Sequence, residues 1–334
     1  MIIAVFIPHG GCPEKCHFCD QKTSGGTPVS AKHVTDTIDV HLATNGGTAT
    51  ELAFYGGTFT AMPRDRQLAY LNAAKPYFDA GVINGLRIAT RPDALDEQWL
   101  KLLRDTYFLK TVELGAQSFT SAVLLGLGRS HSPQSIESGV KLLRELGLKS
   151  SLHMMIGCPN EADDEDQQTV TWLKQLRPDF VRIHPLLVIA GTELERRWKT
   201  DNTFVPLKLE AALERAAWLV EQIEAMGVKI IRLGLQPNDL LDLNVVAGPY
   251  HPAFGDLVRG QITRNRIARQ VDSLNEPSRG RVLKLTVSRR LASGLKNRAA
   301  AHLTWLKNRY ELSDITIEET LEPHKLSDQL HARF

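Results

Sequence analysis

Cysteine is scarce in this chain of 334 residues: of only four cysteines, three lie within eight residues of one another. Such a distribution does not make a disulfide framework. Long apolar runs are also missing, since none approaches the ~18 residues that a membrane span requires. The first residues form an apolar, strand-like run without the basic leader of a signal peptide. We therefore expect no transmembrane helix and a location in the reducing cytoplasm.

A strong net charge is absent as well. The 40 Lys and Arg nearly balance the 38 Asp and Glu, and the hydrophobic content of 43% is that of an ordinary globular protein. A chain of 334 residues can bury a full α/β core and still carry a small second domain. Length and composition therefore fit a soluble enzyme.

The three clustered cysteines follow the first apolar run, in Cys12-Pro-Glu-Lys-Cys16-His-Phe-Cys19. The spacing C-x3-C-x2-C places three thiolates around one point. A structural zinc ion normally takes four protein ligands, and ordinary ferredoxin clusters take four cysteines. A cubane cluster held by three thiolates instead leaves one iron open for a substrate or cosubstrate. The alternative is a zinc site whose fourth ligand comes from elsewhere; the candidates are His17, His9 and Cys158.

Apolar runs of strand length alternate with segments whose apolar residues recur at three and four. We expect strands at 2–7, 51–55, 85–89, 111–115, 151–156, 180–184 and 229–233. We expect helices at 66–80, 96–105, 133–146, 164–176 and 207–226. This alternation indicates parallel βα units, and thus an α/β fold that forms a partial βα barrel of six or seven units. A doubly wound open sheet is the competing architecture, although no G-x-G-x-x-G follows the first strand.

The second expected strand ends in Gly56-Gly57-Thr58. Glycine permits positive φ angles and close backbone approach, so carbonyls here can accept hydrogen bonds from a ligand ammonium. A pair of glycines alone is typical of many loops. Its place at a strand end, about forty residues after the cysteines, points to a ligand site.

The cysteine motif, with Phe18 just before its last cysteine, resembles the signature of the radical S-adenosylmethionine (SAM) enzymes. Over roughly residues 1–240, the chain resembles the radical SAM half of the Elongator catalytic subunit and its shorter bacterial relatives. The segments that carry this resemblance are Ile7-Pro-His-Gly-Gly-Cys12, Phe54-Tyr-Gly-Gly-Thr-Phe59, Ala89-Thr-Arg91-Pro92-Asp93, Val112-Glu113-Leu-Gly-Ala-Gln117-Ser118, His153-Met-Met-Ile-Gly157 and Arg182-Ile-His184-Pro-Leu-Leu-Val-Ile-Ala-Gly-Thr192. Two features depart from the Elongator subunit: we expect no acetyltransferase domain after the barrel, and the first gap of the cysteine motif is much shorter.

The resemblance implies that Cys12, Cys16 and Cys19 hold a 4Fe-4S cluster whose open iron binds SAM. Reductive cleavage of SAM then gives a 5′-deoxyadenosyl radical. The other implied contacts are Phe18 near the adenine, Gly56, Gly57 and Thr58 at the methionine ammonium (with Thr58 in place of the commoner glutamate), Glu113 and Gln117 at the ribose or substrate, and Gly157 beside the adenine.

Four later residues attract attention by their type and place. Arg182 and Arg232, late in their strands, are candidates for carboxylate or phosphate contacts, with a salt bridge that closes the barrel as the alternative. His184 is expected in the barrel interior, preferably as a hydrogen-bonded core histidine. We expect Cys158 to be a small buried hydrophobic residue.

Residues 248–255 contain too many turn-forming residues for a helix or strand interior. We expect this segment to cross the barrel mouth and to link to the C-terminal region. Tyr250 and His251 are candidate catalytic donors of a proton or hydrogen atom. The alternative is a packed linker without a chemical role.

Charge is segregated along the chain, because residues 257–310 carry a net charge of +11, residues 1–256 carry −5, and residues 311–334 carry −4. Such a basic segment is typical of binding to a phosphate backbone. The alternative is a basic face that docks on the acidic barrel. We place the domain boundary at residues 245 and 246, between the barrel and a basic α+β extension.

Within this extension, strand, helix, loop, helix and strand are expected at 281–287, 289–293, 294–297, 298–310 and 315–319. This order resembles half of a KH module, whose GXXG loop clamps an RNA backbone. Asn297 stands where the second glycine of that loop would be. Lys296 and Arg298 are the expected RNA contacts.

Two function classes follow from these patterns. The first is a radical SAM enzyme that acts on RNA, most simply a tRNA base, with a reductase such as flavodoxin or ferredoxin as its electron donor. The second is a radical SAM enzyme that acts on a small molecule, as in the similar oxygen-independent coproporphyrinogen oxidases, with a purely structural extension. A non-enzymatic iron–sulfur or zinc protein is a distant third.

Overall fold

The computed structural model describes residues 2–20, 30–44, 51–200, 204–288, 300–319 and 330–334. The chain divides into two compact units. Unit 1 comprises Met1–Ala212 and Gln222–Pro252, and unit 2 comprises Leu213–Glu221 and Ala253–Phe334. The functional boundary expected at residues 245 and 246 stays a prediction, and it lies close to this structural division.

Unit 1 alternates strands and helices, and its last long helix, α9, contributes residues to both units. In chain order the elements are β1 (Ile2–Phe6), α2 (Ala31–Thr44), β2 (Glu51–Tyr55), α3 (Arg64–Asp79), β3 (Leu86–Thr90), α4 (Glu97–Tyr107), β4 (Leu109–Gln117), α5 (Ser121–Gly126), α6 (Pro133–Glu145), β5 (Lys149–Ile156), α7 (Glu165–Leu176), β6 (Phe180–Pro185), β7 (Val188–Ile189), α8 (Glu193–Thr200), α9 (Leu209–Ala225), β8 (Lys229–Leu233), α10 (Asp239–Asn244) and β9 (Val245–Ala247). The seven expected strands and five expected helices are all present, with ends within two residues of their predicted positions.

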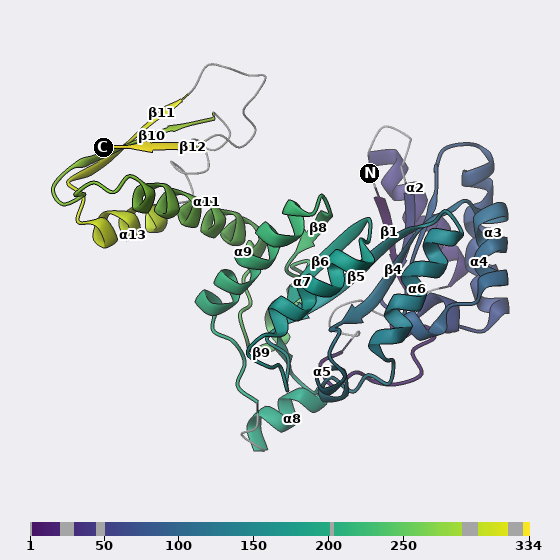
Figure 1. The fold of residues 1–334 in the computed structure, drawn as a ribbon. Coiled ribbons are helices and arrows are strands. Elements are labelled where there is room, and N and C mark those ends of the chain that lie inside the picture. The colour runs from purple at the N-terminus through teal and green to yellow at the C-terminus, as the bar shows by residue number, and fades with distance from the viewer. Residues whose placement is uncertain (1, 21–29, 45–50, 201–203, 289–299, 320–329) are drawn as a thin grey trace. The chain divides into compact units, whose positions relative to one another are not determined.

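Seven strands form one parallel sheet in the order β1-β2-β3-β4-β5-β6-β8 (Figure 1). The order follows the chain without the reversal that defines a doubly wound sheet, so that alternative is wrong. The sheet curls strongly: the Arg182 guanidinium of β6 lies 5.3 Å from the centre of the Tyr55 ring of β2. In a flat sheet, strands four places apart would be separated by about 19 Å. The predicted partial barrel is therefore confirmed.

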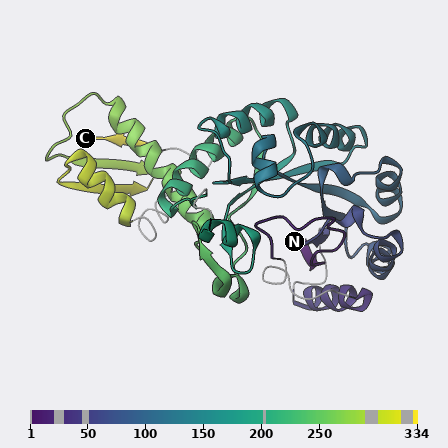
Figure 2. The ribbon, with the colours of Figure 1, turned by 90° about the horizontal axis from the view of Figure 1, so that it is seen from below.

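The helices of unit 1 lie outside the curled strands (Figure 2). Local sequence signals fix several helix ends. Ser132 caps α6, accepting a hydrogen bond from the Ser135 amide, and Pro133 occupies the first turn. Asp96 caps α4 in the same way through the Trp99 amide. On β5, apolar Leu152, Met154 and Ile156 lie on one face, which leaves Ser151 and His153 on the other.

A small antiparallel pair, β7 with β9, was not predicted from the sequence. It is too short for a periodic pattern, and its two strands are far apart in the chain. Phe254 and Gly255 were expected in an irregular linker, but they begin helix α11 (Phe254–Ser273). The turn-forming residues therefore end at Ala253, two residues before expected.

Unit 2 contains α11, β10 (Val282–Val287), α13 (Ala300–Tyr310), β11 (Asp314–Glu319) and β12 (Leu330–Arg333). Strand β10 is central, parallel to β11 and antiparallel to β12. The expected helix at 289–293, the loop at 294–297, and Lys296 and Arg298 lie outside the described residues. The KH-like interpretation thus stays a prediction. No described helix is long and apolar enough to cross a membrane.

Candidate active site

The cysteine loop follows β1 at the carboxyl edge of the sheet, where βα barrels place their chemistry. Cys12, Cys16 and Cys19 are all partly buried, and none of them forms a disulfide. The loop is tightly turned: the Cys12 amide donates to the His9 carbonyl at 3.2 Å, and the Cys19 amide donates to the Cys16 carbonyl at 3.0 Å. The three thiols therefore belong to one compact loop.

The glycine loop after β2 packs directly on the start of the cysteine loop. The Thr58 amide donates to the Gly10 carbonyl at 2.7 Å. A Cβ on Gly57 would lie 2.3 Å from the Gly10 oxygen, and a Cβ on Gly11 would lie 2.3 Å from the Thr58 oxygen, so each loop requires glycine where it meets the other. The buried Thr58 hydroxyl lies 3.6 Å from the Cys12 sulfur. The structure thus brings together the two sequence motifs on which the site prediction depends.

His17 anchors the other end of the cysteine loop. Its amide donates to the Leu127 carbonyl at 2.9 Å, and its carbonyl accepts from the Leu194 amide at 2.7 Å. Its ring Nδ1 lies 3.0 Å from the Gly126 carbonyl. These contacts, on both the main chain and the ring, give His17 a structural role at this end of the loop.

Phe18, expected near the adenine, packs against a buried apolar cluster. The cluster comprises Val123, Leu127, Cys158, Leu186, Val188, Leu194 and Phe204. Cys158 is 6% exposed, which confirms its prediction as a small buried hydrophobic residue. Its apolar surroundings also make it an unsuitable zinc ligand.

Two arginines that sequence reasoning left without a role bind the cysteine loop. Arg129 donates to the Cys16 sulfur at 3.4 Å and to the Gly115 carbonyl at 2.8 Å, so it links the loop to the end of β4. Arg91, at the end of β3, pairs with Glu14 of the loop at 3.3 Å. For Arg91 the position directly after a barrel strand was the available signal, because loops at that edge carry the functional side chains.

Charged side chains meet on the concave face of the sheet. Glu113 is 2% exposed and accepts from Arg87 at 2.8 Å, from Arg182 at 2.7 Å and from the Tyr55 hydroxyl at 2.9 Å. Arg87 also pairs with Glu51 at 2.6 Å. Burial raises the pKa of Glu113, but Arg182 and Arg87 outweigh it and hold that pKa below its usual value. The salt-bridge alternative stated for Arg182 is therefore realised, and Glu113 is committed to three protein partners.

Gln117 is the residue at which β4 departs from regular geometry. The register between β4 and β5 shifts between Leu114 and Gln117, and Gln117 has a φ of +64°. Its side-chain Oε1 is buried and has no hydrogen-bond partner within the described part of the chain. Positive φ in a non-glycine residue together with an unpaired buried acceptor is typical of a ligand-binding position. The expectation that Gln117 contacts a ligand is thus supported by its geometry, while its role stays a prediction.

His184 lies in the interior, beside His153 of the neighbouring strand, with ring centres 4.1 Å apart. Its Nε2 is buried without a partner among the described residues, so the preferred interpretation as a hydrogen-bonded core histidine does not hold for this atom. Burial lowers the pKa of His153 to about 3 and lowers that of His184 well below its usual range. Both rings are therefore neutral at pH 7.

Gly157 and Tyr250, two further residues expected at the site, both lie against apolar side chains. Gly157 has a φ of +77°, and a Cβ there would lie 2.6 Å from the side chain of Leu207. Its expected place beside an adenine stays a prediction. Tyr250 packs against Leu187, Ile189 and Leu241 of another apolar cluster and donates its hydroxyl proton to Asp242. Burial and this contact raise the pKa of Tyr250 to about 12.

His251 follows Tyr250 and is partly buried. Because the Tyr250 hydroxyl is engaged by Asp242, the packed-linker alternative gains weight over a donor role for Tyr250. The catalytic assignment of Tyr250 and His251 stays a prediction.

Three thiols on one loop are a donor set that suits an iron–sulfur cluster. In the described residues, no three His, Cys, Asp or Glu side chains gather closely enough to hold one metal ion. In a cubane each thiolate binds a different iron, so the sulfurs lie farther apart than around one zinc. A guanidinium beside Cys16 also suits a thiolate ligand or an anionic cosubstrate. Cys12, Cys16 and Cys19 would hold the cluster.

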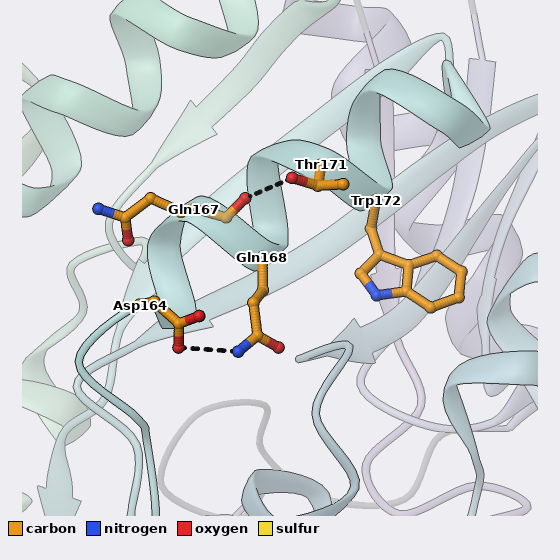
Figure 3. Close-up of a pocket in the computed structure, with 5 residues that line it drawn as sticks. All are labelled: Asp164, Gln167, Gln168, Thr171 and Trp172. Carbon is orange, nitrogen blue, oxygen red and sulfur yellow. Dashed lines mark hydrogen bonds between the residues drawn. The ribbon is translucent and has the colours of Figure 1, made fainter.

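A shallow hollow lies elsewhere, on α7 (Figure 3). It is lined by Asp164, Gln167, Gln168, Thr171 and Trp172, all from the helix and the residue before it. Gln168 donates to Asp164 at 2.8 Å, and the Thr171 hydroxyl donates to the Gln167 carbonyl at 2.9 Å, so these polar groups are mutually satisfied. None of the expected site residues lies there.

Comparison with known proteins gives the chain a family context. The model of the radical SAM superfamily matches residues 6–173, and that of the radical SAM C-terminal domain matches residues 178–264. The chain is 28% identical to the tRNA uridine(34) acetyltransferase of Methanocaldococcus infernus over 300 residues, which are 77% of this chain and 55% of that enzyme. It is 26% identical to human Elongator complex protein 3 over 65% of this chain and 46% of that protein.

Among solved structures, Elp3 of Methanocaldococcus infernus, with an N-terminal deletion, resembles this fold with a TM-score of 0.61. The sequence identity is 24%, and the match covers 79% of this chain and 63% of that one. The present chain thus spans about half the length of the curated relatives described above.

Proposed function

The chain belongs to the radical SAM superfamily of enzymes, and we propose that it uses a 4Fe-4S cluster and SAM to modify a tRNA base. When bound, the two cofactors would supply a 5′-deoxyadenosyl radical by one-electron reduction of SAM, with methionine as the other product. Membership in an enzyme superfamily sets aside the non-enzymatic alternative. The observation that carries the proposal is the contact between the cysteine loop and the glycine loop, sealed by the 2.7 Å bond from Thr58 to Gly10.

Each part of the site has a defined task in this proposal. Cys12, Cys16 and Cys19 bind the cluster. Thr58, beside Cys12, offers its hydroxyl and the neighbouring glycine carbonyls to the methionine ammonium. Arg129, beside Cys16, is placed to attract the methionine carboxylate. The unpaired Oε1 of Gln117 accepts a hydrogen bond from the ribose or the substrate.

The choice of tRNA rests on the relatives and on the charge of unit 2. The relative from Methanocaldococcus infernus is a tRNA uridine acetyltransferase by name. In unit 2, the Arg264 guanidinium lies 4.2 Å from the centre of the Trp305 ring, and that of Arg309 lies 5.2 Å from it. An aromatic ring flanked by arginines offers stacking and phosphate contacts to a nucleic acid. The electron donor in this proposal is a flavodoxin or ferredoxin in the reducing cytoplasm.

A small-molecule substrate remains the second candidate, because much of the basic charge has local partners. Arg266 and Arg269 both pair with Glu221, Arg281 pairs with Glu276, and Lys307 pairs with Asp314. Such pairs are largely exposed and contribute little stability each. They nevertheless reduce the positive potential that an RNA would meet, which favours a structural use of the segment.

The test is made with the full chain, reconstituted without oxygen. The protein should load about four irons and, with dithionite, convert SAM to methionine and 5′-deoxyadenosine. Unmodified tRNA should bind with an affinity that falls steeply between two salt concentrations. Tight zinc binding without SAM cleavage would contradict the radical chemistry. SAM cleavage without salt-dependent tRNA affinity would instead move the assignment to a small molecule.

A further inference from the structure

Positive charge exceeds negative charge on the β6–β8 side of the concave face. Arg182 of β6 and Arg232 of β8 are register partners in adjacent strands. The carboxylate of Glu113 is shared between Arg182 and Arg87, and Glu51 serves Arg87. Three guanidiniums thus face two carboxylates, and the nearby His153 and His184 are neutral at pH 7.

The excess charge resides on Arg232. Its guanidinium donates to the neutral amide of Gln236 and forms no ion pair with any residue that the structure describes. Burial and the neighbouring Arg182 both lower the pKa of Arg232. Two positive charges that lie close together in a half-buried site destabilise the folded protein unless an anion binds between them. Arg182 cannot turn away, because Glu113 holds one of its nitrogens and the Tyr55 ring lies under its guanidinium.

Three buried polar atoms next to this charge have no hydrogen-bond partner within the described residues. They are Nε of Arg182, Nε2 of His184 and the hydroxyl of Ser151. All three side chains occupy alternate, inward positions of the adjacent strands β5 and β6. A guanidinium nitrogen, an imidazole nitrogen and a hydroxyl can each donate a hydrogen bond. The ligand that accepts from all three and neutralises Arg232 is an oxyanion.

We propose that Arg232, Arg182, His184 and Ser151 bind an oxyanion of the substrate, a phosphate or a carboxylate, inside the curled sheet. This inference rests on the proposed function, because it assigns the part of the site that holds the substrate rather than the cofactors. If the substrate is RNA, the oxyanion is a phosphodiester next to the modified nucleotide. If the substrate is a small molecule, it is a carboxylate. Arg182 is the fixed contact, held by Glu113, and Arg232 is the contact that lacks a charged partner until the oxyanion arrives.

Binding is measured by thermal melting of the full chain with its reconstituted cluster, in rising inorganic phosphate, acetate or chloride at equal ionic strength. Phosphate should raise the melting temperature of the wild type more than chloride does if the natural group is a phosphate. A larger effect of acetate would assign the site to a carboxylate. Equal melting curves in all three salts would overturn the proposal.

Arg232→Gln should weaken the specific anion effect on the order of tenfold, the loss expected for a charged hydrogen-bonding partner. Arg232→Lys keeps the charge and should retain most of the effect. Arg66→Gln, on the exposed surface of α3, removes an equal charge and should leave the anion effect unchanged. Without anions, Arg232→Gln should melt at or above the wild-type temperature, because it relieves repulsion by Arg182.

A structural role for Arg232 predicts the reverse. Arg232→Gln would then melt at a lower temperature without anions and keep the full anion effect, and that result would overturn the proposal. Because anion binding is read from melting, its failure is distinguishable from a failure of the radical chemistry, which would appear as absent SAM cleavage in the wild type.

Discussion

The concave face of unit 1 and the core of unit 2 are built from opposite kinds of side chain. Unit 2 closes over eight buried apolar residues, namely Ile267, Ala268, Val271, Leu283, Leu285, Val287, Leu306 and Leu312. The concave face of unit 1 carries a chain of buried ion pairs from Glu51 through Arg87 and Glu113 to Arg182. Apolar burial stabilises a unit directly, whereas buried ion pairs roughly offset their own desolvation. The first arrangement is a scaffold, and under our proposal the second holds charges in place for a ligand.

The same contrast appears in the polar atoms left without partners. In unit 1 the unpaired atoms of Gln117, Ser151, Arg182 and His184 belong to neighbouring strands of one sheet, on or next to its concave face. In unit 2 the corresponding atom among the described residues is Nε of Arg264, beside the Trp305 ring. A concentration of unpaired buried groups costs stability, and functional sites are where such a cost is maintained.

The largest expected effect concerns the thiols. Cys16→Ala should abolish iron loading and SAM cleavage while the protein still folds, because the cysteine loop lies outside the sheet and its packed helices. The matched control is Cys158→Ala, which removes a thiol from an apolar cluster. It should keep its iron and its SAM cleavage and lose about 1 kcal/mol of stability through the small cavity. Iron content and 5′-deoxyadenosine formation are measured; SAM cleavage by Cys16→Ala, or iron loss in Cys158→Ala, would contradict the assignment.

The next largest effect concerns the ion pairs of the concave face. Glu113→Gln keeps the shape of the side chain but leaves Arg87 and Arg182 buried without their shared carboxylate. The free energy of unfolding should fall by about 3–5 kcal/mol, as when one partner of a buried pair is removed. The exposed Glu97→Gln, which ends a surface pair with Lys101, should change it by less than about 0.5 kcal/mol. Chemical denaturation measures the free energy of unfolding of both variants. Similar losses of stability in Glu113→Gln and Glu97→Gln would contradict the expected difference between buried and exposed ion pairs.

Much of this architecture could be predicted from the sequence, and the reason is periodicity. The strands and helices of the barrel repeat over many residues, and the cysteine and glycine loops lie at strand ends, so their meeting at one edge follows from parallel topology. The hydrogen-bond partners could not be predicted. Glu113 was expected at a ligand and is held by Arg182, because which inward side chains meet depends on how tightly the sheet curls. The contact of Arg129 with the cysteine loop was not predicted, because a single arginine in a loop has no periodic signature.

Acid should weaken unit 1 through two inward-facing histidines, the partly buried His153 and the buried His184. His153 has a pKa of about 3 in the folded protein, against 6.5 when unfolded, and the pKa of His184 is also strongly lowered. The unfolded chain therefore binds more protons than the folded one as the pH falls below 6.5. The contribution of the neutral histidines to the free energy of unfolding is fully present above pH 6.5. It is lost below that pH, by up to about 1.4 kcal/mol per pH unit for each histidine.

The measurement is the free energy of unfolding between pH 7 and pH 5. His153→Asn or His184→Asn should flatten this profile, and His33→Asn on the exposed surface of α2 should leave it unchanged. Glu113 reduces the stability further only at lower pH. Its pKa is lowered in the folded protein, so its carboxylate stays ionised until the pH falls below the usual value of 4.5. A wild-type profile that stays flat from pH 7 to pH 5 would show that the histidines are accessible to protons in the folded state.

The smallest effect is expected for single charges of unit 2, since its basic residues lie outside an apolar core. Arg309 lies over the rings of Trp305 and Tyr310. If it contacts a phosphate, Arg309→Gln should weaken tRNA binding a few-fold and reduce the slope of log affinity against log salt by about 0.9. Reversing the charges of Lys296 and Arg298 together should weaken tRNA binding further, while SAM cleavage without substrate persists.

Lys75→Gln on α3 of unit 1, which removes one exposed charge, is the control and should leave the salt slope of tRNA binding unchanged. If the basic segment is only structural, the unit 2 variants would instead lower the melting temperature, and the wild type would show no salt-dependent affinity for tRNA.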